Sequence, residues 1–319
     1  MKGISLEKAR RLYIIFHGDL DGIIGAALLA RWAESRGSRW ELHHSTVRAL
    51  PRVVRSVANR ARSMLGRPGV ALVDLAIQSV SDAILYSRYL RGMPAAWFDH
   101  HPWPEGAAER LLEAGVEVYH YRDMVSAELV ARALGLSDEY SVKLVEVAKA
   151  DDTCEPGDSV ADRWRIVLRS LRDPRKAVEA FIRGELWPEW AEKLYSETAP
   201  RYLEEAERSA SRLHVYEHDG RRVAVILMEP GVDVCTVQKL LWSRGWDPER
   251  VDVEIYVYPR ALSLRSVRVD VSCIAKKLGG GGHKRAAGAP RPSQSMGEAQ
   301  LARLVANLVG ECVEGDTRQ

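Results

Sequence analysis

The sequence predicts an α/β protein with a parallel N-terminal sheet and a smaller C-terminal α/β domain, joined by a helical linker. The first 135 residues alternate short apolar runs with helical patterns, which is typical of a parallel sheet with crossover helices. From Ser137 to about His214 the pattern is helical throughout. A second alternating region begins at Arg222. These patterns alone divide the chain into an N-terminal domain at 1–187, a helical linker at 188–220 and a C-terminal domain at 221–319.

The N-terminal elements follow from apolar runs of four to six residues separated by amphipathic stretches. The predicted strands are Tyr13–Phe16, Trp40–His44, Val70–Leu75, Ala95–Phe98 and Val116–Tyr119. The predicted helices between and after them are Ile23–Arg36, Val80–Leu90 and Ala127–Leu134.

The C-terminal elements begin with a strand in VAVILME after Arg222. A helix is expected near Val234–Ser243, followed by strands in DVEIYVYPR and LSLRSVRV. A helix at Ser272–Leu278 then leads into a run of glycines, and a last helix is expected near Glu298–Leu308.

Composition bounds the class of protein. The chain has 319 residues, a net charge of +2 and 28% charged residues, so a global basic excess for duplex DNA or a membrane surface is not present. No apolar run reaches the roughly 20 residues that span a bilayer. The four cysteines are scattered without a CxxC pair, which predicts neither a zinc knuckle nor a disulfide framework. We therefore expect a cytoplasmic protein with reduced thiols.

Acidic and histidine side chains follow several of the apolar runs. In parallel sheets, ligands bind outside the carboxyl ends of the strands, so these side chains are expected to converge. Carboxylates with neutral imidazoles and no cysteine suit Mn²⁺ or Mg²⁺ better than structural zinc. The residues are His17, Asp19 and Asp21; Asp74; Asp99, His100 and His101; and Asp151 and Asp152.

Each of these residues also has a simpler reading. A single Asp after a strand is usually a turn residue or a helix N-cap, and Asp19 or Asp21 can serve that role for the helix at Gly22. His43 and His44 are interpreted as residues of a strand edge at the surface.

A second motif, LGGGGHKR, lies near the C-terminus. Gly279 suits a helix C-cap, but four glycines followed by His283, Lys284 and Arg285 exceed what a cap needs. Glycines let backbone N–H groups approach an anion, and the three side chains add charge. The alternative is a flexible loop.

Four segments together resemble the motifs of the DHH phosphoesterase superfamily: HGDLDG in the H-x-D-x-D-G form of archaeal RecJ-like members, ALVDLA, FDHH and ADDT. The resemblance covers nearly the whole chain and implies a dinuclear site for two divalent ions, with Mn²⁺ expected ahead of Mg²⁺. It implies His17, Asp19 and Asp74 on one ion and Asp21, Asp74, His100 and Asp152 on the other. Asp151 stays an alternative to Asp152.

The same resemblance assigns further roles. His101 would face the substrate phosphate, and Asp99 would orient a neighbouring imidazole, as carboxylates do for metal-bound histidines. The C-terminal segment resembles the domain that accompanies DHH, which implies substrate binding by Arg265 and by Gly280, Gly281, Gly282 and His283, across a cleft from the metals.

The resemblance implies a phosphodiesterase that hydrolyses short single-stranded oligonucleotides, as nanoRNases do, and also 3′-phosphoadenosine 5′-phosphate. The alternatives are a cyclic dinucleotide phosphodiesterase and a RecJ-like single-strand exonuclease. A non-catalytic nucleic-acid-binding scaffold is disfavoured because every motif keeps its carboxylates and imidazoles. A membrane is not an expected partner, and a homodimer is left open. Trp103 is a candidate for stacking on a base.

Overall fold

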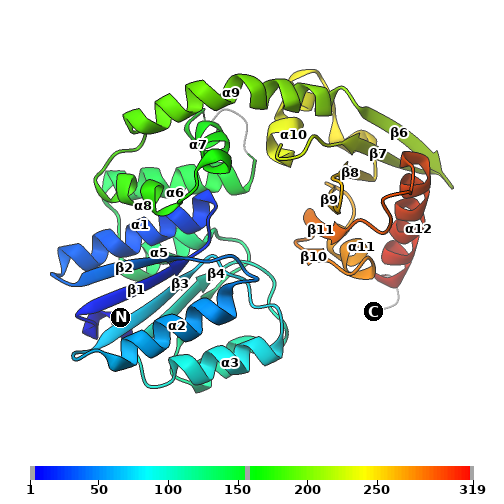
Figure 1. The fold of residues 1–319 in the computed structure, drawn as a ribbon. Helices are drawn as coiled ribbons and strands as arrows, with labels where there is room; N and C mark the ends of the chain where they lie inside the picture. Colours follow the sequence, from blue (N-terminus) through cyan, green and yellow to red (C-terminus); the bar gives the residue numbers. More distant parts are fainter. Residues whose placement is uncertain (1–3, 155–158, 317–319) are drawn as a thin grey trace. The chain divides into compact units, whose positions relative to one another are not determined.

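The computed structural model describes residues 4–154 and 159–316, which form two compact units, 1–197 and 198–319. The division falls inside helix α9, Glu189–Ala210. The three-part division given above from the sequence stays a prediction. Figure 1 labels helices and strands of both units.

The first unit is built on a five-stranded parallel sheet in the order β2-β1-β3-β4-β5. This confirms the parallel α/β class. The strands are β1 Arg11–Phe16, β2 Arg39–His44, β3 Pro68–Val73, β4 Ala95–Asp99 and β5 Glu117–His120. The helices are α1 Leu20–Ser35, α2 Leu50–Ser63, α3 Val80–Leu90, α4 Ala107–Glu113, α5 Ser126–Leu134, α6 Glu139–Asp152, α7 Ser159–Ser170 and α8 Arg175–Ile182, with a 3₁₀ turn at Ser5–Lys8.

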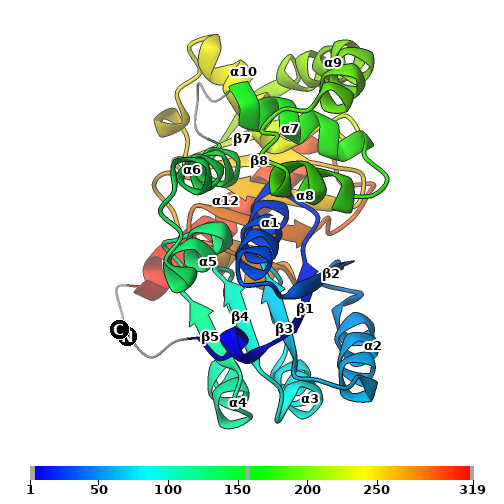
Figure 2. The same cartoon turned by 90° about the vertical axis from the view of Figure 1, so that its left-hand side faces the viewer.

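Alternation along the strands divides the core of this unit into two layers. On β1, Ile14 and Phe16 pack with α1, α5, α6, α7 and α8, whereas Tyr13 and Ile15 pack with α2, α3 and α4. Figures 1 and 2 show α1 on one face of the sheet and α2 and α3 on the other. Because both faces are covered, the strands are apolar almost throughout, as expected for a parallel sheet.

Strand order determines where a ligand site can form. The chain passes from β1 outward to β2 and then returns to β3 on the other side of β1. The loops after β1 and β3 therefore leave in opposite directions, which opens a crevice at their carboxyl ends.

The second unit has a mixed six-stranded sheet in the order β10-β11-β9-β8-β7-β6, in which only the β7–β8 pair of the described strands is parallel. Helices α11 and α12 pack on one of its faces. The elements are β6 Leu213–His218, β7 Arg221–Leu227, α10 Val234–Ser243, a 3₁₀ turn at Pro248–Arg250, β8 Val253–Val257, β9 Ala261–Arg265, α11 Val271–Lys277, β10 Gly281–Gly282, β11 Ala286–Pro290 and α12 Glu298–Asp316.

One part of the C-terminal expectation is wrong, and the alternative given for the glycine run is ruled out. The region taken as helical up to His214 already enters strand β6, an edge strand whose alternation is mostly polar and therefore gives a weak apolar signal. The glycine run is a hairpin of β10 and β11, not a flexible loop. A Cβ at Gly280 would lie 2.0 Å from the carbonyl oxygen of Gly288, and Gly282 has φ +141°, so close strand packing requires glycine at these two positions.

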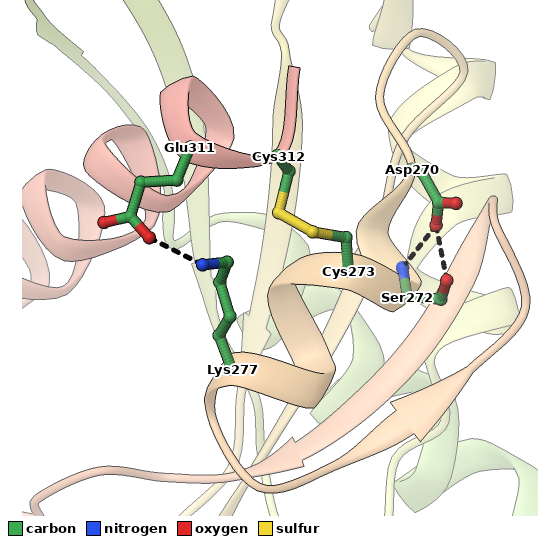
Figure 3. Close-up of a disulfide and its surroundings, with 6 residues drawn as sticks. All are labelled: Asp270, Ser272, Cys273, Lys277, Glu311 and Cys312. Atoms are coloured by element: carbon green, nitrogen blue, oxygen red, sulfur yellow. Dashed lines mark hydrogen bonds and ion pairs between the residues drawn. A yellow bond between two sulfur atoms is a disulfide. The ribbon is translucent and has the colours of Figure 1, made fainter. Parts of the chain in front are cut away.

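The expectation of reduced thiols is also wrong. Cys273 of α11 and Cys312 of α12 form a disulfide with their Cα atoms 6.1 Å apart (Figure 3), and none of the four cysteines is free in the described structure. The two cysteines are separated by 39 residues, and only the packing of the two helices brings them together. Spacing in the sequence carries no sign of this pairing.

In the described parts of the chain, no helix combines the length and the apolar character that crossing a bilayer requires.

We expect the disulfide to stabilise the second unit substantially. Closing a loop with a sequence separation of 39 stabilises a fold by about 4 kcal/mol in the chain-entropy model. Cys312→Ser should therefore lower the free energy of unfolding by about 2–4 kcal/mol, measured by urea denaturation.

The neighbouring residue provides a matched control. Glu311 pairs with Lys277 at 2.7 Å, and both side chains are about half exposed (Figure 3). Exposed ion pairs contribute less than about 1 kcal/mol to the free energy of unfolding, so Glu311→Gln should leave the urea midpoint of unfolding nearly unchanged. Equal midpoints for the two variants would contradict a stabilising role of the disulfide.

Candidate metal centre

The side chains predicted to bind metal lie together at the carboxyl edge of the parallel sheet. His17 and Asp19 follow β1, Asp74 follows β3, and His100 follows β4. Two groups of ligand atoms lie within metal-binding distance of one another, namely His17–Asp19–Asp74 and Asp74–His100–His101. Asp74 belongs to both groups.

Asp74 sits in a strained and buried position. It is 1% exposed and has φ +59°, a left-handed conformation that costs a non-glycine residue free energy and is found preferentially at functional sites. Its Oδ1 accepts a hydrogen bond from the Ser126 hydroxyl at 3.1 Å. Its Oδ2 is buried without a hydrogen-bond partner among the described residues. A buried carboxylate oxygen left in this state is costly unless a cation compensates it.

The first group is held by the start of helix α1. His17 Nδ1 lies 2.6 Å from Asp19 Oδ2 and 3.6 Å from Asp74 Oδ2. Asp19 also accepts a hydrogen bond from the backbone N–H of Gly22 at 3.2 Å, which makes it the N-cap of α1. Asp19 therefore combines the capping role with a place in the cluster. A Cβ at Gly22 would lie 2.6 Å from the carbonyl oxygen of His17, so the glycine of the motif permits this close turn.

The second group surrounds His100. Its Nε2 lies 3.6 Å from Asp74 Oδ1, 3.9 Å from Asp21 Oδ2 and 3.8 Å from Asp152 Oδ1. The carboxylate of Asp21 is buried and accepts the backbone N–H groups of Ser126 at 2.7 Å and Ala127 at 2.8 Å. These donors are the N-terminus of α5, where partial positive charge favours an anion.

The structure separates the two adjacent aspartates of the fourth motif. Asp151 is paired with Arg165 at 2.6 Å, and Arg165 is nearly buried. Asp152 instead points to His100. The geometry therefore supports Asp152 over Asp151 as the candidate ligand.

Asp99 holds His101 from behind. His101 Nδ1 lies 2.8 Å from Asp99 Oδ1, and the indole N–H of Trp103 donates to Asp99 Oδ2 at 2.5 Å. His120 stacks on Trp103 with ring centroids 4.3 Å apart and has its Nε2 2.6 Å from the carbonyl oxygen of His101. Trp103 therefore supports Asp99 within this network.

The cluster shifts the pKa of its members in opposite directions. The charge of Asp19 raises the pKa of His17 to about 11. Burial lowers the pKa of His100, but Asp74 and the other carboxylates outweigh it and raise that pKa to about 9. Burial likewise opposes the charged form of His101, and Asp99 and Asp74 raise its pKa to about 10. Burial also disfavours an ionised Asp74, yet the imidazoles of His100 and His17 hold its pKa well below the usual range.

Several supporting residues were missed by the sequence reasoning. Ser126 and Ala127 donate to two of the candidate ligands from α5, and His120 packs behind His101. They lie in other segments and carry no motif of their own. A helix predicted to begin at Ala127 is the one signal that an anion-binding N-terminus was present.

In the second unit, the residues predicted to bind substrate gather at one end of the sheet. Arg265 ends β9 and pairs in register with Ala286 of β11. His283 closes the β10–β11 turn, with its backbone N–H donating to the carbonyl oxygen of Ala286 at 2.8 Å. Arg265 Nη1 donates to Ser263 Oγ at 2.7 Å. The hairpin thus places Gly280, Gly281 and Gly282 next to the strand that carries Arg265.

The donor set fits divalent cations. Carboxylate oxygens and imidazole nitrogens suit Mn²⁺ and Mg²⁺. Asp74 Oδ2, which is buried without a hydrogen bond among the described residues and lies 3.6 Å from His17 Nδ1, is an oxygen that a cation would compensate. His17, Asp19 and Asp74 would hold one ion, and Asp21, Asp74, His100 and Asp152 the other.

Comparison with known proteins places this fold. No family model and no curated protein matches the sequence, but solved structures do. The DHH domain of a member of the s1p family of ribosomal proteins superposes with a TM-score of 0.70 at 12% identity, over 96% of this chain and 88% of that chain.

Two further solved structures carry descriptions of activity. An exonuclease RecJ bound to manganese has a TM-score of 0.54 at 16% identity, over 97% of this chain and 92% of that chain. The pGpG-specific phosphodiesterase PggH of Vibrio cholerae has a TM-score of 0.53 at 13% identity, over 95% of this chain and 99% of that chain. The resemblance to the DHH superfamily is thus confirmed at the level of the fold.

We expect Asp152 and Asp151 to differ in their effect on metal binding. Asp152→Asn should weaken Mn²⁺ binding by about 10-fold or more, because a charged ligand is lost from a cluster that must offset a divalent cation. Asp151→Asn should leave Mn²⁺ affinity within about twofold, although it should lower stability because Arg165 loses a charged partner. Mn²⁺ titration by calorimetry, with circular dichroism to normalise for folded protein, measures both. A larger loss for Asp151→Asn would reverse the assignment.

We also expect Mn²⁺ binding to release protons. The pKa values of about 11 for His17 and about 9 for His100 mean that both imidazoles are protonated at neutral pH in the metal-free protein. Each proton competes with the metal, since a coordinating imidazole must be neutral. Mn²⁺ affinity should therefore rise between pH 7 and 9, with release of about two protons at pH 7.5. Calorimetry in buffers of different ionisation enthalpy measures the number, and a release of none would contradict the role of these histidines.

Proposed function

We propose that this chain, a protein with the DHH fold, is a metal-dependent phosphodiesterase that hydrolyses short single-stranded oligonucleotides to mononucleotides. The observation that carries the proposal is the shared position of Asp74 between two carboxylate–imidazole groups. A pair of divalent ions in such a site activates a water and stabilises the leaving oxygen of a phosphoryl displacement. We expect Mn²⁺, with Mg²⁺ as the alternative.

The protein side chains would have separate tasks. Asp74 would be common to both ions, and its strained backbone holds its carboxylate in the middle of the cluster. His101 would donate a hydrogen bond from its Nε2–H to the substrate phosphate, because its Nδ1 is paired with Asp99, which together with Asp74 raises its pKa to about 10. Charge stabilisation by a preorganised donor of this kind is the usual source of electrostatic catalysis.

In the second unit, Arg265 and the hairpin of Gly280–Gly282 with His283 would bind a terminal phosphate or base of the substrate. Arg265 has its guanidinium held by Ser263, and a preorganised guanidinium loses less entropy on binding a phosphate. The backbone N–H groups of the hairpin add anion-binding capacity.

Short substrates are supported by one of the structural neighbours. PggH is described as specific for pGpG, a dinucleotide. We propose 3′-phosphoadenosine 5′-phosphate as a further substrate of this chain. We also propose a cytoplasmic location and a homodimer as its oligomeric state. RecJ-like exonuclease activity on long single strands is the second candidate, favoured by the likeness to RecJ. A cyclic dinucleotide phosphodiesterase is the third.

The test is a substrate-length series with Mn²⁺. RNA and DNA of 2 to 24 nucleotides are incubated with the protein, together with cyclic di-AMP and 3′-phosphoadenosine 5′-phosphate. We expect mononucleotide products and higher kcat/KM for oligonucleotides of a few residues than for 24-mers. Asp74→Asn should reduce kcat by about 10²-fold or more.

A matched control uses an aspartate outside the cluster. Asp123 is exposed, and Asp123→Asn should retain activity within about twofold, as expected for a surface substitution. Preference for 24-mers would favour the RecJ-like candidate. Faster cleavage of cyclic di-AMP than of a linear dinucleotide would favour the cyclic dinucleotide phosphodiesterase. Unchanged hydrolysis in Asp74→Asn would refute the role of Asp74.

A further inference from the structure

A cavity of about 480 Å³ lies in the first unit at the carboxyl end of the edge strand β2. Its size falls within the range of about 300–1,000 Å³ found for ligand sites. We call it the β2 pocket. It is lined by Leu42, His43 and His44 of β2, Val53, Ser56 and Val57 of α2, and Arg172, Asp173, Pro174 and Arg175 before and at the start of α8.

The β2 pocket adjoins the metal centre through His44. A Cβ built on Gly18 would lie 2.6 Å from His44 Nε2, so the imidazole lies directly on the backbone between His17 and Asp19. Phe16 pairs in register with His44, which keeps the two strand ends level. One wall of the pocket is therefore also a boundary of the candidate metal centre.

The lining combines apolar and cationic groups. Leu42, Val53 and Val57 supply the apolar part of the lining beside the two imidazoles, with Val53 the most accessible of the three. Asp173 is neutralised by its ion pair with Arg175 at 2.7 Å. Arg172 is exposed and has no ion pair in residues 4–154 and 159–316. The pocket thus carries net positive charge next to surfaces on which a base can stack.

Beyond the pocket, the outer surface of α2 is strongly basic. Residues 42–73 contain six arginines and no Asp or Glu, in a chain whose net charge is only +2. The apolar face of α2 packs on the sheet through Leu50, Val54 and Val57.

Arg52 and Arg55 lie on the outer surface of α2, and Arg48 lies in the turn that leads into it, with the i, i+4, i+7 spacing that continues the same side. They are exposed and have no ion pair in the described structure. We call them the α2 arginine stripe. Arg52 lies one turn before Ser56 on the pocket wall, so the stripe begins at the rim of the β2 pocket.

We infer that the β2 pocket and the α2 arginine stripe form a binding track for the nucleotides next to the scissile phosphate of a single-stranded oligonucleotide. The pocket takes the adjacent nucleotide, with its base against the imidazoles and apolar wall, and the stripe binds the phosphates beyond it. Stacking surfaces combined with a line of cationic side chains are how proteins bind single strands without sequence preference. This inference rests on the proposed function.

The apolar wall distinguishes an oligonucleotide from inorganic polyphosphate, which is also a chain of phosphates. Polyphosphate gains nothing from Leu42, Val57 or the imidazole faces. The track therefore predicts that an oligonucleotide of about five residues is held more tightly than a dinucleotide, because only the longer chain reaches the stripe.

The test measures binding without turnover. Fluorescence anisotropy of fluorescein-labelled pentanucleotide and dinucleotide, as RNA and as DNA, is recorded in EDTA for the full chain. Arg52→Ser/Arg55→Ser should weaken binding of the pentanucleotide by about tenfold at low salt and reduce the slope of log K against log salt by about 1.4, since each phosphate contact on a single strand contributes about 0.7. Arg172→Ser should weaken both ligands.

The control removes the same charge elsewhere on the unit. Arg88 and Arg91 are exposed at the C-terminal end of α3. This end of the helix lies at the amino edge of the sheet, away from the metal centre. Neither arginine has an ion pair among the described residues. Arg88→Ser/Arg91→Ser should change pentanucleotide affinity by less than about twofold.

Equal losses in the two double variants would overturn the track. Competition by inorganic polyphosphate as strong as that by an unlabelled oligonucleotide would overturn the assignment of a nucleotide to the pocket. Because binding is measured in EDTA, a chain that binds oligonucleotide through the stripe but hydrolyses none would refute the proposed function and leave the track standing. If the protein hydrolyses dinucleotides but Arg52→Ser/Arg55→Ser binds the pentanucleotide as the unsubstituted chain does, the track is refuted and the proposed function stands.

Discussion

The site depends on the carboxylate of Asp74. Asp74 is buried directly after strand β3, in a left-handed backbone conformation that an L-residue adopts only when the surrounding structure imposes it. One of its oxygens faces His100 and His101 and the other faces His17. The remaining candidate ligands are arranged around it from three other segments. A conformational change at Asp74 would therefore disturb both groups at once.

The main chain contributes as much to this arrangement as the side chains do. The N-termini of α1 and α5 both open onto the cluster: Asp19 caps the first, and the carboxylate of Asp21 accepts two N–H groups from the second. Peptide dipoles thus stabilise negative charge where several carboxylates are crowded together. Imidazolium groups and these N–H donors offset the mutual repulsion of the carboxylates in the metal-free cluster, and a divalent cation would replace the imidazole protons in that role.

The sequence predicts the part of the fold that depends on local pattern and on strand ends. The five strands of the first unit follow from apolar runs, whereas helices α2 and α4 are not among the predicted elements. The candidate ligands His17, Asp74 and His100 follow from their position after those runs. The edge strand β6 and the β10–β11 hairpin were missed because edge strands and glycine-rich strands bury few side chains. Ser126 was missed for another reason: its contact with Asp74 spans 52 residues and depends only on tertiary packing. The disulfide between Cys273 and Cys312 is invisible in the sequence for the same reason.

Total charge is a poor guide to the electrostatics of this protein. A net charge of +2 argues against binding to polyanions when the charges are spread evenly. Here they are separated along the carboxyl edge of one sheet. The aspartates occupy the ends of the central strands, whereas residues 42–73, which include helix α2, contain six arginines and no acidic residue. The α2 arginines attract an anionic substrate over a Debye length of about 10 Å, whereas the carboxylates of the metal-free cluster repel it. Such a substrate needs cations at the cluster to bind there but not along α2. If the proposed function and the binding track hold, removal of divalent metal is expected to abolish phosphate binding at the cluster and to leave binding along α2 in place.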